Sequence, residues 1–264
     1  MPYANNNGVK IHYEVEGSGP PLILQHGFSD SLESWYDLGY VEALKRNYGL
    51  ILVDARGHGE SDKPHDTGYY RPEITASDYV KILDDLNIQK VHYWGYSMGV
   101  QYFLSCIVEY ASSRICSVIM GGGIPYELKQ TKTEEDETHK FSHPMLDMVE
   151  KGPEAWVALI EQGGVKLPDK TRACWLRNDL KALLASQRAA WEWQRRDSLP
   201  RIDVPCLVYV GEADGSFRKA NEAVKVMSES TFISIPGLNH IQGYLRSDLV
   251  LPHVKKFLAE VDRK

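Results

Sequence analysis

VHYWGYSMGVQYF, residues 91–103, is the stretch of this chain that decides its fold. Its opening run is short and rich in β-branched and aromatic residues, which predicts a strand, whereas apolar residues recur at helical spacing from Met98 onward. Ser97 therefore lies on a turn between a strand and a helix, with Gly95 before it and Gly99 after it. This is a G-x-S-x-G motif in the strand–turn–helix context that its chemistry requires.

Such a turn suits a serine nucleophile. It projects the hydroxyl from the carboxyl ends of the strands, where open α/β sheets bind their ligands. Small residues two positions before and after the serine allow the strand and the helix to approach closely. A serine hydroxyl alone is a poor nucleophile, so Ser97 needs a general base, and that base needs a group to orient it.

Short apolar runs alternate with amphipathic segments along the first half of the chain. The run at 9–15 alternates apolar and polar residues, as expected for an antiparallel edge strand. Buried-type strands are predicted at 22–25, 50–53, 91–94 and 115–120. Because helical patterns such as the one at 73–86 separate these strands, we predict a mainly parallel α/β sheet covered on both faces.

The second half contains a break in this alternation. Strands return at 206–210 and 231–235, and a last helix follows from about residue 248. Residues 124–200, which precede these strands, contain helical stretches but no convincing strand, and they hold four of the six tryptophans. We therefore predict a core formed by residues 1–123 and 201–264, with a helical cap at 124–200 inserted into it.

The base and its orienting acid are expected at other strand ends. His240, in PGLNHIQ, comes just after the final strand and can reach the same edge of the sheet as Ser97. The segment LVYVGEADGSF offers Glu212 and Asp214 directly after a strand. Asp214 is the preferred acid, because the longer turn lets it pass beneath the histidine, and Glu212 is the alternative.

Acyl transfer also requires donors for the oxyanion of the tetrahedral intermediate. The turn geometry predicts the N–H of Met98 as one donor. The loop HGF that follows the strand at 22–25 provides the second, with Gly27 permitting the bend and the Phe28 N–H facing the site. We expect the side chain of His26 to be structural.

Composition and charge narrow the classes of function. The chain has 264 residues, of which 43% are hydrophobic and 25% charged, as is usual for globular enzymes. Its net charge of -6 disfavours nucleic-acid binding, and no apolar run approaches the length of a membrane span. The start shows no signal-peptide pattern, and the four scattered cysteines read as reduced thiols, so a cytoplasmic location is expected. No feature specifies the oligomeric state.

The motifs LILQHGF, VDARGHGES, WGYSMG, GEAD and GLNH together resemble the α/β-hydrolase fold superfamily, in its esterase-, lactonase- and perhydrolase-like branch. The resemblance spans nearly the whole chain, and the cap is its least diagnostic part. It implies a mostly parallel eight-stranded sheet, a triad of Ser97, Asp214 and His240, and an oxyanion hole from Phe28 and Met98. It also implies that Arg56 and His58 belong to a structural loop.

The substrate pocket and possible metal ligands are less well defined by the sequence. Trp156, Met145, Met148 and Trp191 are candidates for an apolar acyl pocket, although packing of the cap explains Trp191 equally well. His139 and His143 have the i, i+4 spacing of metal ligands but lack an evident third ligand, so we expect no metal. No cofactor is implied.

The sequence therefore predicts a serine hydrolase that cleaves a small or medium apolar carboxylic ester, or a lactone, through an acyl-serine intermediate. Two alternatives keep the same site: carbon–carbon bond hydrolysis and perhydrolysis with peroxide. A third alternative is a hydrolase-fold ligand receptor with vestigial turnover. The only partner expected for the leading hypothesis is the small-molecule ester.

Overall fold

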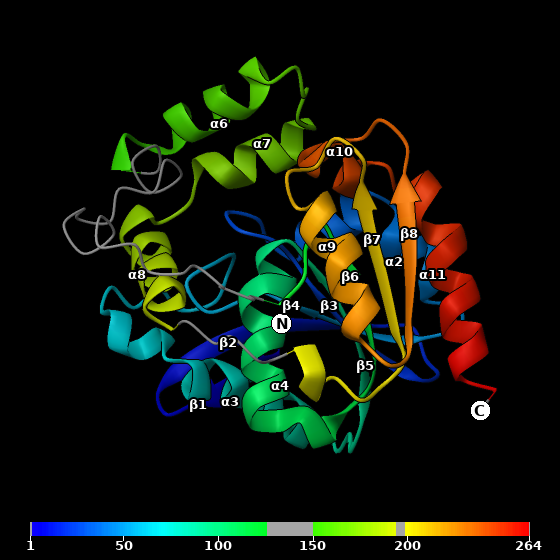
Figure 1. Ribbon diagram of the computed structural model, residues 1–264. Helices are drawn as coiled ribbons and strands as arrows, with labels where there is room; N and C mark the ends of the chain where they lie inside the picture. Colours follow the sequence, from blue (N-terminus) through cyan, green and yellow to red (C-terminus); the bar gives the residue numbers. More distant parts are fainter. Residues whose placement is uncertain (1, 126–149, 194–198, 264) are drawn as a thin grey trace, which may run out of the picture.

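The core of the protein is one eight-stranded, mostly parallel sheet (Figure 1). The computed structural model describes residues 2–125, 150–193 and 199–263. In the sheet, the strand order is β1-β2-β4-β3-β5-β6-β7-β8, and β3 through β8 are mutually parallel. The strands are β1 (Tyr3–Asn6), β2 (Val9–Glu16), β3 (Pro21–Gln25), β4 (Gly49–Val53), β5 (Val91–Tyr96), β6 (Ile115–Gly121), β7 (Cys206–Gly211) and β8 (Ser230–Ile235). The predicted fold class is thereby confirmed.

Alternate residues of each central strand contribute to two separate hydrophobic cores, one on each face of the sheet. In β3, Ile23 packs on one face while Leu22 and Leu24 pack on the other. The first face is covered by α3 (Pro72–Asp85), α4 (Ser105–Ala111) and α9 (Phe217–Ala223). The second face is covered by α1 (Glu33–Asp37), α2 (Tyr40–Leu44), α10 (His240–Leu245) and α11 (Ser247–Val261). Burial on both faces explains why the central strands are continuously apolar.

The edge of the sheet differs from the sequence prediction. The strand predicted at 9–15 is present as β2, but it lies between β1 and β4 and is antiparallel to both. The edge strand is instead β1, a four-residue strand of sequence YANN. Its polar composition concealed it, and short polar strands are typical of exposed sheet edges.

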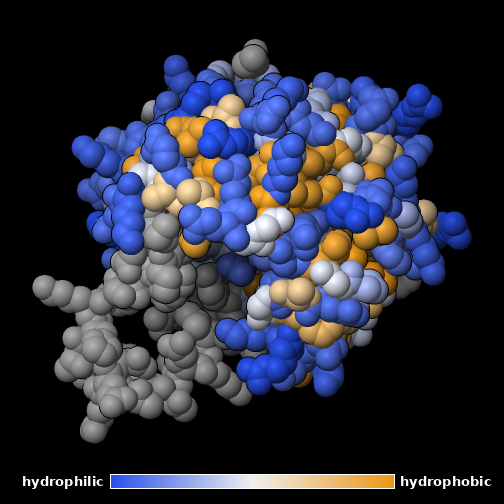
Figure 2. Space-filling view, turned by 90° about the horizontal axis from the view of Figure 1, so that it is seen from above, coloured by the Kyte–Doolittle hydropathy of each residue, from blue (hydrophilic) through white to orange (hydrophobic). Residues whose placement is uncertain are grey.

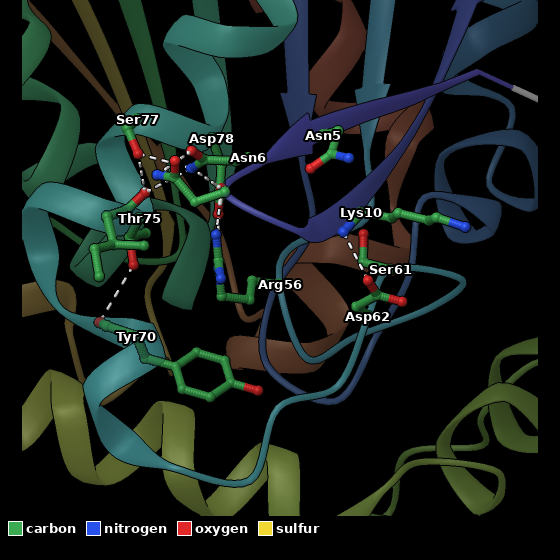
Figure 3. A network of polar contacts seen from close by, with 12 residues as sticks. Asn5, Asn6, Lys10, Arg56, Ser61, Asp62, Tyr70, Thr75, Ser77 and Asp78 are labelled. Atoms are coloured by element: carbon green, nitrogen blue, oxygen red, sulfur yellow. Dashed lines mark hydrogen bonds and ion pairs between the residues drawn. The ribbon is translucent and has the colours of Figure 1, made fainter.

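The loop after β4, which carries the motif DARGHGES, is held by buried polar contacts. Arg56 donates to Asp78 on α3 from Nε over 3.0 Å and from Nη2 over 2.6 Å, and Asn6 of β1 donates to the same carboxylate over 2.7 Å (Figure 3). Asp54 accepts a hydrogen bond from the Leu32 N–H over 2.8 Å. The loop therefore connects the edge of the sheet, α3 and the segment that follows β3.

His58 in this loop makes the stability of the protein sensitive to acid. Its side chain is fully buried, and burial lowers its pKa to about 3. An unfolded histidine has a pKa of about 6.5, so below that pH the unfolded state binds a proton at this residue and the folded state does not. We therefore expect His58 to lower the free energy of unfolding by about 1.4 kcal/mol for each pH unit between about pH 6 and pH 4.

The measurement is denaturant unfolding of the wild type and His58→Gln across this pH range. The destabilisation caused by His58→Gln should shrink as the pH falls, because the variant lacks the titrating group. His253→Gln, at an exposed position on α11, is the matched control. A difference between wild type and His58→Gln that stays constant with pH would refute this assignment.

The secondary-structure elements described between β6 and β7 are all helical. These are α6 (Pro153–Gln162), α7 (Asp169–Leu176), α8 (Leu180–Glu192) and a 3₁₀ turn η5 (Leu199–Arg201). Helices α6 and α7 lie above the carboxyl ends of the strands, next to α10 (Figure 1). Their apolar side chains form a small core of their own, which Ile241 and Leu245 of α10 complete. Seen from this side, hydrophobic patches alternate with hydrophilic residues across the surface (Figure 2).

Candidate active site

Ser97 occupies a strained turn at the end of β5. Its φ is +52°, a left-handed conformation that non-glycine residues adopt rarely and that is often found at functional sites. The Ser97 N–H donates to the carbonyl of Gly121 over 2.8 Å, while its own carbonyl accepts from Val100 and Gln101 over 2.9 and 2.8 Å. The following helix begins as a π-helical segment, η2 (Gly99–Leu104), and continues as α4. The sequence predicted the helix but not its wide first turns.

The glycines on either side of Ser97 are required by close backbone contacts. A β-carbon on Gly95 would lie 2.7 Å from the carbonyl carbon and oxygen of Gly99. A β-carbon on Gly99 would lie 2.6 Å from the Gln25 carbonyl oxygen at the end of β3. Since both obstacles are backbone atoms, neither can rotate away. The motif therefore fixes the serine close to the loop that follows β3.

We expect Gly99→Ala to destabilise the protein, because the added methyl group overlaps the Gln25 carbonyl. Overpacking of this kind costs about 1–3 kcal/mol or more. The control is Gly215→Ala, where a β-carbon would have no neighbour within 4 Å, and its free energy of unfolding should change by about 0.5 kcal/mol or less. Urea unfolding of both variants checks this. Equal stabilities for the two variants would contradict the close approach at Gly99.

His240 is the first residue of α10, a helix that the sequence prediction missed. Asn239 caps this helix by accepting from the Gln242 N–H over 2.9 Å, and the Gln242 side chain accepts from the Asn239 N–H over 3.0 Å. This reciprocal pair is a capping box, and the sequence NHIQ carries its signal. The hydroxyl of Tyr96 also donates to the His240 carbonyl. The histidine backbone is thus held by its own helix and by the end of β5.

The structure brings His240 between Ser97 and Asp214. His240 Nε2 lies 2.8 Å from Ser97 Oγ, and His240 Nδ1 lies 2.7 Å from Asp214 Oδ2. Ser97 lies 143 positions before His240 in the chain and Asp214 lies 26 positions before it, and each of the three follows a different strand of the sheet. Glu212, the alternative acid, is exposed and accepts a hydrogen bond from Ser234 over 2.7 Å instead.

Asp214 is buried in a tight turn after β7 that favours its ionised form. Burial alone would raise its pKa, but the hydrogen bond and charge of His240, together with the N–H and hydroxyl of Ser216, lower the pKa below its usual range. Both Ser216 groups donate to Asp214 Oδ1 over 2.8 Å. Because an ionised carboxylate only accepts hydrogen bonds, His240 Nδ1 carries a proton and donates it to Asp214. His240 Nε2 then has its lone pair free to accept from the Ser97 hydroxyl.

The predicted oxyanion donors lie in the two segments that meet at Ser97. A β-carbon on Gly27 would lie 3.3 Å from Ser97 Cβ, so the loop after β3 packs directly against the nucleophile. Phe28 follows this contact, and Met98 begins the helical turn on the other side, where N–H groups lack intrahelical partners. The ring nitrogens of His26 are occupied, since Nε2 accepts from the Ala55 N–H over 3.1 Å and Nδ1 donates to the Gly27 carbonyl over 2.7 Å. His26 therefore acts as scaffold.

A mainly apolar cavity of about 210 Å³ opens over Ser97 and His240. One wall comes from the core and the other from α6, α7 and the segment between them. The Phe28 and Trp156 rings meet edge to face at 5.9 Å, and the Trp156 and Trp175 rings stack at 6.0 Å. The lining residues are Gly27, Phe28, Asp30, Tyr96, Ser97, Trp156, Ile160, Leu167, Thr171, Trp175, His240, Ile241, Tyr244 and Leu245.

The sequence identified few of the residues that line this cavity. Of the four residues proposed for a substrate pocket, Trp156 lines this cavity, whereas Met145, Met148 and the side chain of Trp191 lie outside the described part of the structure. His139 and His143 also lie outside it. The sequence analysis missed Ile241, Tyr244 and Leu245, although the capping box before them indicates the helix that carries them. No sequence signal indicates that Thr171 and Asp30 line the cavity, because a single polar residue beside a loop is usually solvated.

The described residues hold neither a metal-binding cluster nor a membrane span. Among residues 2–125, 150–193 and 199–263, no group of three or more His, Cys, Asp or Glu side chains has the arrangement of a metal site. Within the same ranges, none of the helices has the length and apolar character needed to cross a membrane.

Comparison with known proteins agrees with this architecture. A family model described as the alpha/beta hydrolase fold matches residues 20–132. A putative non-heme chloroperoxidase of Synechocystis sp. is 26% identical, covering 98% of this chain and 100% of that protein. A putative 2-succinyl-6-hydroxy-2,4-cyclohexadiene-1-carboxylate synthase of Bacillus subtilis is 28% identical, covering 95% and 96%. The enol-lactonase from Burkholderia xenovorans superimposes with a TM-score of 0.77 at 22% identity, covering 98% of this chain and 100% of that one.

The sheet order, the serine turn and these matches define one fold. The protein has the α/β-hydrolase fold, and residues 20–132 match the family model of that description. Within that fold, chemistry is set by the site rather than by the scaffold, because the fold hosts many unrelated reactions.

Proposed function

We propose that this protein is a serine hydrolase that cleaves a small or medium apolar carboxylic ester, or a lactone, through an acyl-serine intermediate. The observation that carries the proposal is the continuous hydrogen-bonded chain from Ser97 Oγ through His240 to Asp214, with distances of 2.8 and 2.7 Å. Its geometry matches what general-base activation of a serine requires. The cavity over Ser97 supplies room for the substrate.

In the proposed mechanism, His240 Nε2 takes the proton of Ser97 as the hydroxyl oxygen attacks the ester carbonyl. Asp214 stabilises the resulting imidazolium through Nδ1, and the N–H groups of Phe28 and Met98 donate to the oxyanion. His240 then protonates the leaving alcohol, which leaves the acyl group on Ser97. Water activated by the same histidine releases the acid and restores the serine. No cofactor takes part in these steps.

The cavity sets an upper limit on the substrate. An apolar cavity of about 150 Å³ accepts a benzene molecule, so about 210 Å³ suits an acyl or alcohol group only slightly larger than that. Its walls are mostly aliphatic and aromatic, which favours an apolar group. In this proposal α6 and α7 act as the cap, because they supply Trp156, Leu167 and Trp175 to the cavity.

Perhydrolysis is the second candidate. It uses the same acyl-serine, with hydrogen peroxide in place of water as the second nucleophile. The similarity over nearly the full length to a putative non-heme chloroperoxidase favours this reaction among the alternatives.

The proposal is tested with 4-nitrophenyl esters from acetate to decanoate, and with γ-butyrolactone and δ-valerolactone. We expect kcat/KM to be highest for acyl chains of two to about six carbons and to fall for longer ones, since the cavity is small. Formation of peracetic acid from acetate and hydrogen peroxide, without ester hydrolysis, would select perhydrolysis instead. Rates no higher than those of Ser97→Ala on every ester and lactone would contradict the proposed hydrolase.

A further inference from the structure

The cavity over Ser97 contains a buried carboxyl group that the proposed mechanism does not use. Asp30 lines the cavity and is 3% exposed. Its Oδ1 atom has no hydrogen-bond partner among the described residues. Burial raises its pKa, although the charge of His26 and polar contacts with Ser34, Ser31 and Trp175 offset part of this rise. Buried carboxyl groups without a partner are unfavourable and uncommon in folded proteins, so this unpaired atom calls for an explanation.

Three more residues that line this cavity carry unpaired polar atoms. Thr171, Trp156 and Trp175 line it, and Thr171 Oγ1 and the two indole Nε1 atoms are buried without a partner among the described residues. All three belong to α6 and α7, whereas Asp30 belongs to the segment after β3. Asn178 connects the two sides by donating to the Ser29 carbonyl over 2.7 Å and to the Ser29 hydroxyl over 2.8 Å. Both sides of this part of the cavity are therefore held in place.

The unpaired atoms define the chemistry of the group that would satisfy them. Asp30 Oδ1 accepts a hydrogen bond, the two indole N–H groups donate, and the threonine hydroxyl does either. An alcohol hydroxyl both donates and accepts, so it matches this set. A substrate ammonium group only donates and would leave the indoles unpaired, and a wholly apolar substrate would leave all four atoms unpaired.

We propose that Asp30, with Thr171 and Trp175, forms a polar subsite that selects substrates carrying a hydroxyl group near the scissile bond. This inference rests on the proposed hydrolase activity and narrows its substrate class to small, otherwise apolar esters that carry one hydroxyl group. A site built to pair a substrate hydroxyl discriminates strongly against the analogue without it, because its own polar groups are then left unsatisfied.

The test uses ester pairs in which a hydroxyl replaces a methyl group of similar size. Methyl 3-hydroxybutanoate and methyl 3-methylbutanoate carry the change on the acyl side. 2-Hydroxypropyl acetate and isobutyl acetate carry it on the alcohol side. For at least one pair, we expect the ratio of kcat/KM for the hydroxy ester to that for the methyl analogue to fall about tenfold or more in Asp30→Leu, and by a smaller factor in Thr171→Val.

Two further variants control for folding and for charge. Asp30→Asn keeps the shape of the side chain, and Glu33→Gln removes an exposed carboxylate from the same segment and should leave both ratios unchanged. Because Asp30→Leu removes an unpaired buried oxygen, its unfolding temperature should be unchanged or higher. Unchanged ratios in Asp30→Leu and Asp30→Asn would mean that only solvent pairs with Asp30, and would overturn the inference. A lower unfolding temperature with unchanged ratios would assign Asp30 a structural role instead.

A binding measurement separates this inference from the hydrolase proposal. In Ser97→Ala, which has no nucleophile, calorimetry with phenol and toluene compares a hydroxyl with a methyl group directly. Adding Asp30→Leu should shift the affinity ratio at least about fivefold towards toluene. If this shift occurs although the wild type hydrolyses none of the four esters, the hydrolase proposal fails and the hydroxyl subsite stands. If the esters are hydrolysed and the shift is absent, the subsite is refuted and the hydrolase stands.

Discussion

Ser97→Ala is expected to lower kcat on 4-nitrophenyl acetate at least about a thousandfold, which corresponds to about 4 kcal/mol of lost transition-state stabilisation. The variant keeps the cavity and the oxyanion donors but has no oxygen to attack the carbonyl. The residual rate should therefore reflect water attack assisted by those remaining groups. Stopped-flow and steady-state assays on purified protein, with circular dichroism to establish folding, give this comparison.

Ser234→Ala is the matched control for this loss. Ser234 lies on β8 and its hydroxyl donates only to the exposed Glu212 carboxylate in the contacts of the described residues. Its removal should leave kcat within about twofold of the wild type. Turnover by Ser97→Ala close to that of Ser234→Ala would remove the serine from the mechanism, whatever its geometry.

Asp214→Asn should lower kcat by about a thousand- to ten-thousandfold while leaving KM nearly unchanged. The reason is the direction of the hydrogen bonds around this side chain. The N–H and hydroxyl of Ser216 both donate to Oδ1, so the amide oxygen of the introduced asparagine would take that place and its NH₂ group would face His240. The NH₂ group forces Nδ1 to accept, which places the imidazole proton on Nε2. His240 then has no lone pair for the Ser97 hydroxyl.

Glu212→Gln tests the alternative acid in the same turn. Because Glu212 is exposed and its side chain pairs with Ser234, we expect kcat within about twofold of the wild type. A large loss in Glu212→Gln together with normal turnover in Asp214→Asn would mean that the wrong carboxylate has been assigned to His240.

The positions of the three polar residues along the chain were accessible from the sequence for a simple reason. Each follows a predicted strand, and the carboxyl ends of parallel strands meet at one edge of the sheet. Ser97, Asp214 and His240 therefore had to come near one another once the strands were found. The preference for Asp214 over Glu212 depended on turn length, and in the structure it is Asp214 that contacts His240, over 2.7 Å.

Other features depended on packing that no local pattern records. The polar sequence YANN becomes β1 only because β2 offers an unpaired edge and Asn6 reaches Asp78. The π-helical turns that follow Ser97, whose φ is +52°, leave no trace in the apolar spacing, which is that of an ordinary helix. Asp30 looks like a solvated turn residue in HGFSDS, and it is buried because α7 covers it.

In the proposed mechanism His240, oriented by Asp214, makes Ser97 a nucleophile. Covalent labelling with a fluorophosphonate, followed by mass spectrometry of the intact protein and of its peptides, tests this reactivity. We expect one adduct per chain, on the peptide that contains Ser97, formed at least about a hundredfold more slowly in Asp214→Asn. An unlabelled protein, or an adduct on another residue, would contradict the account.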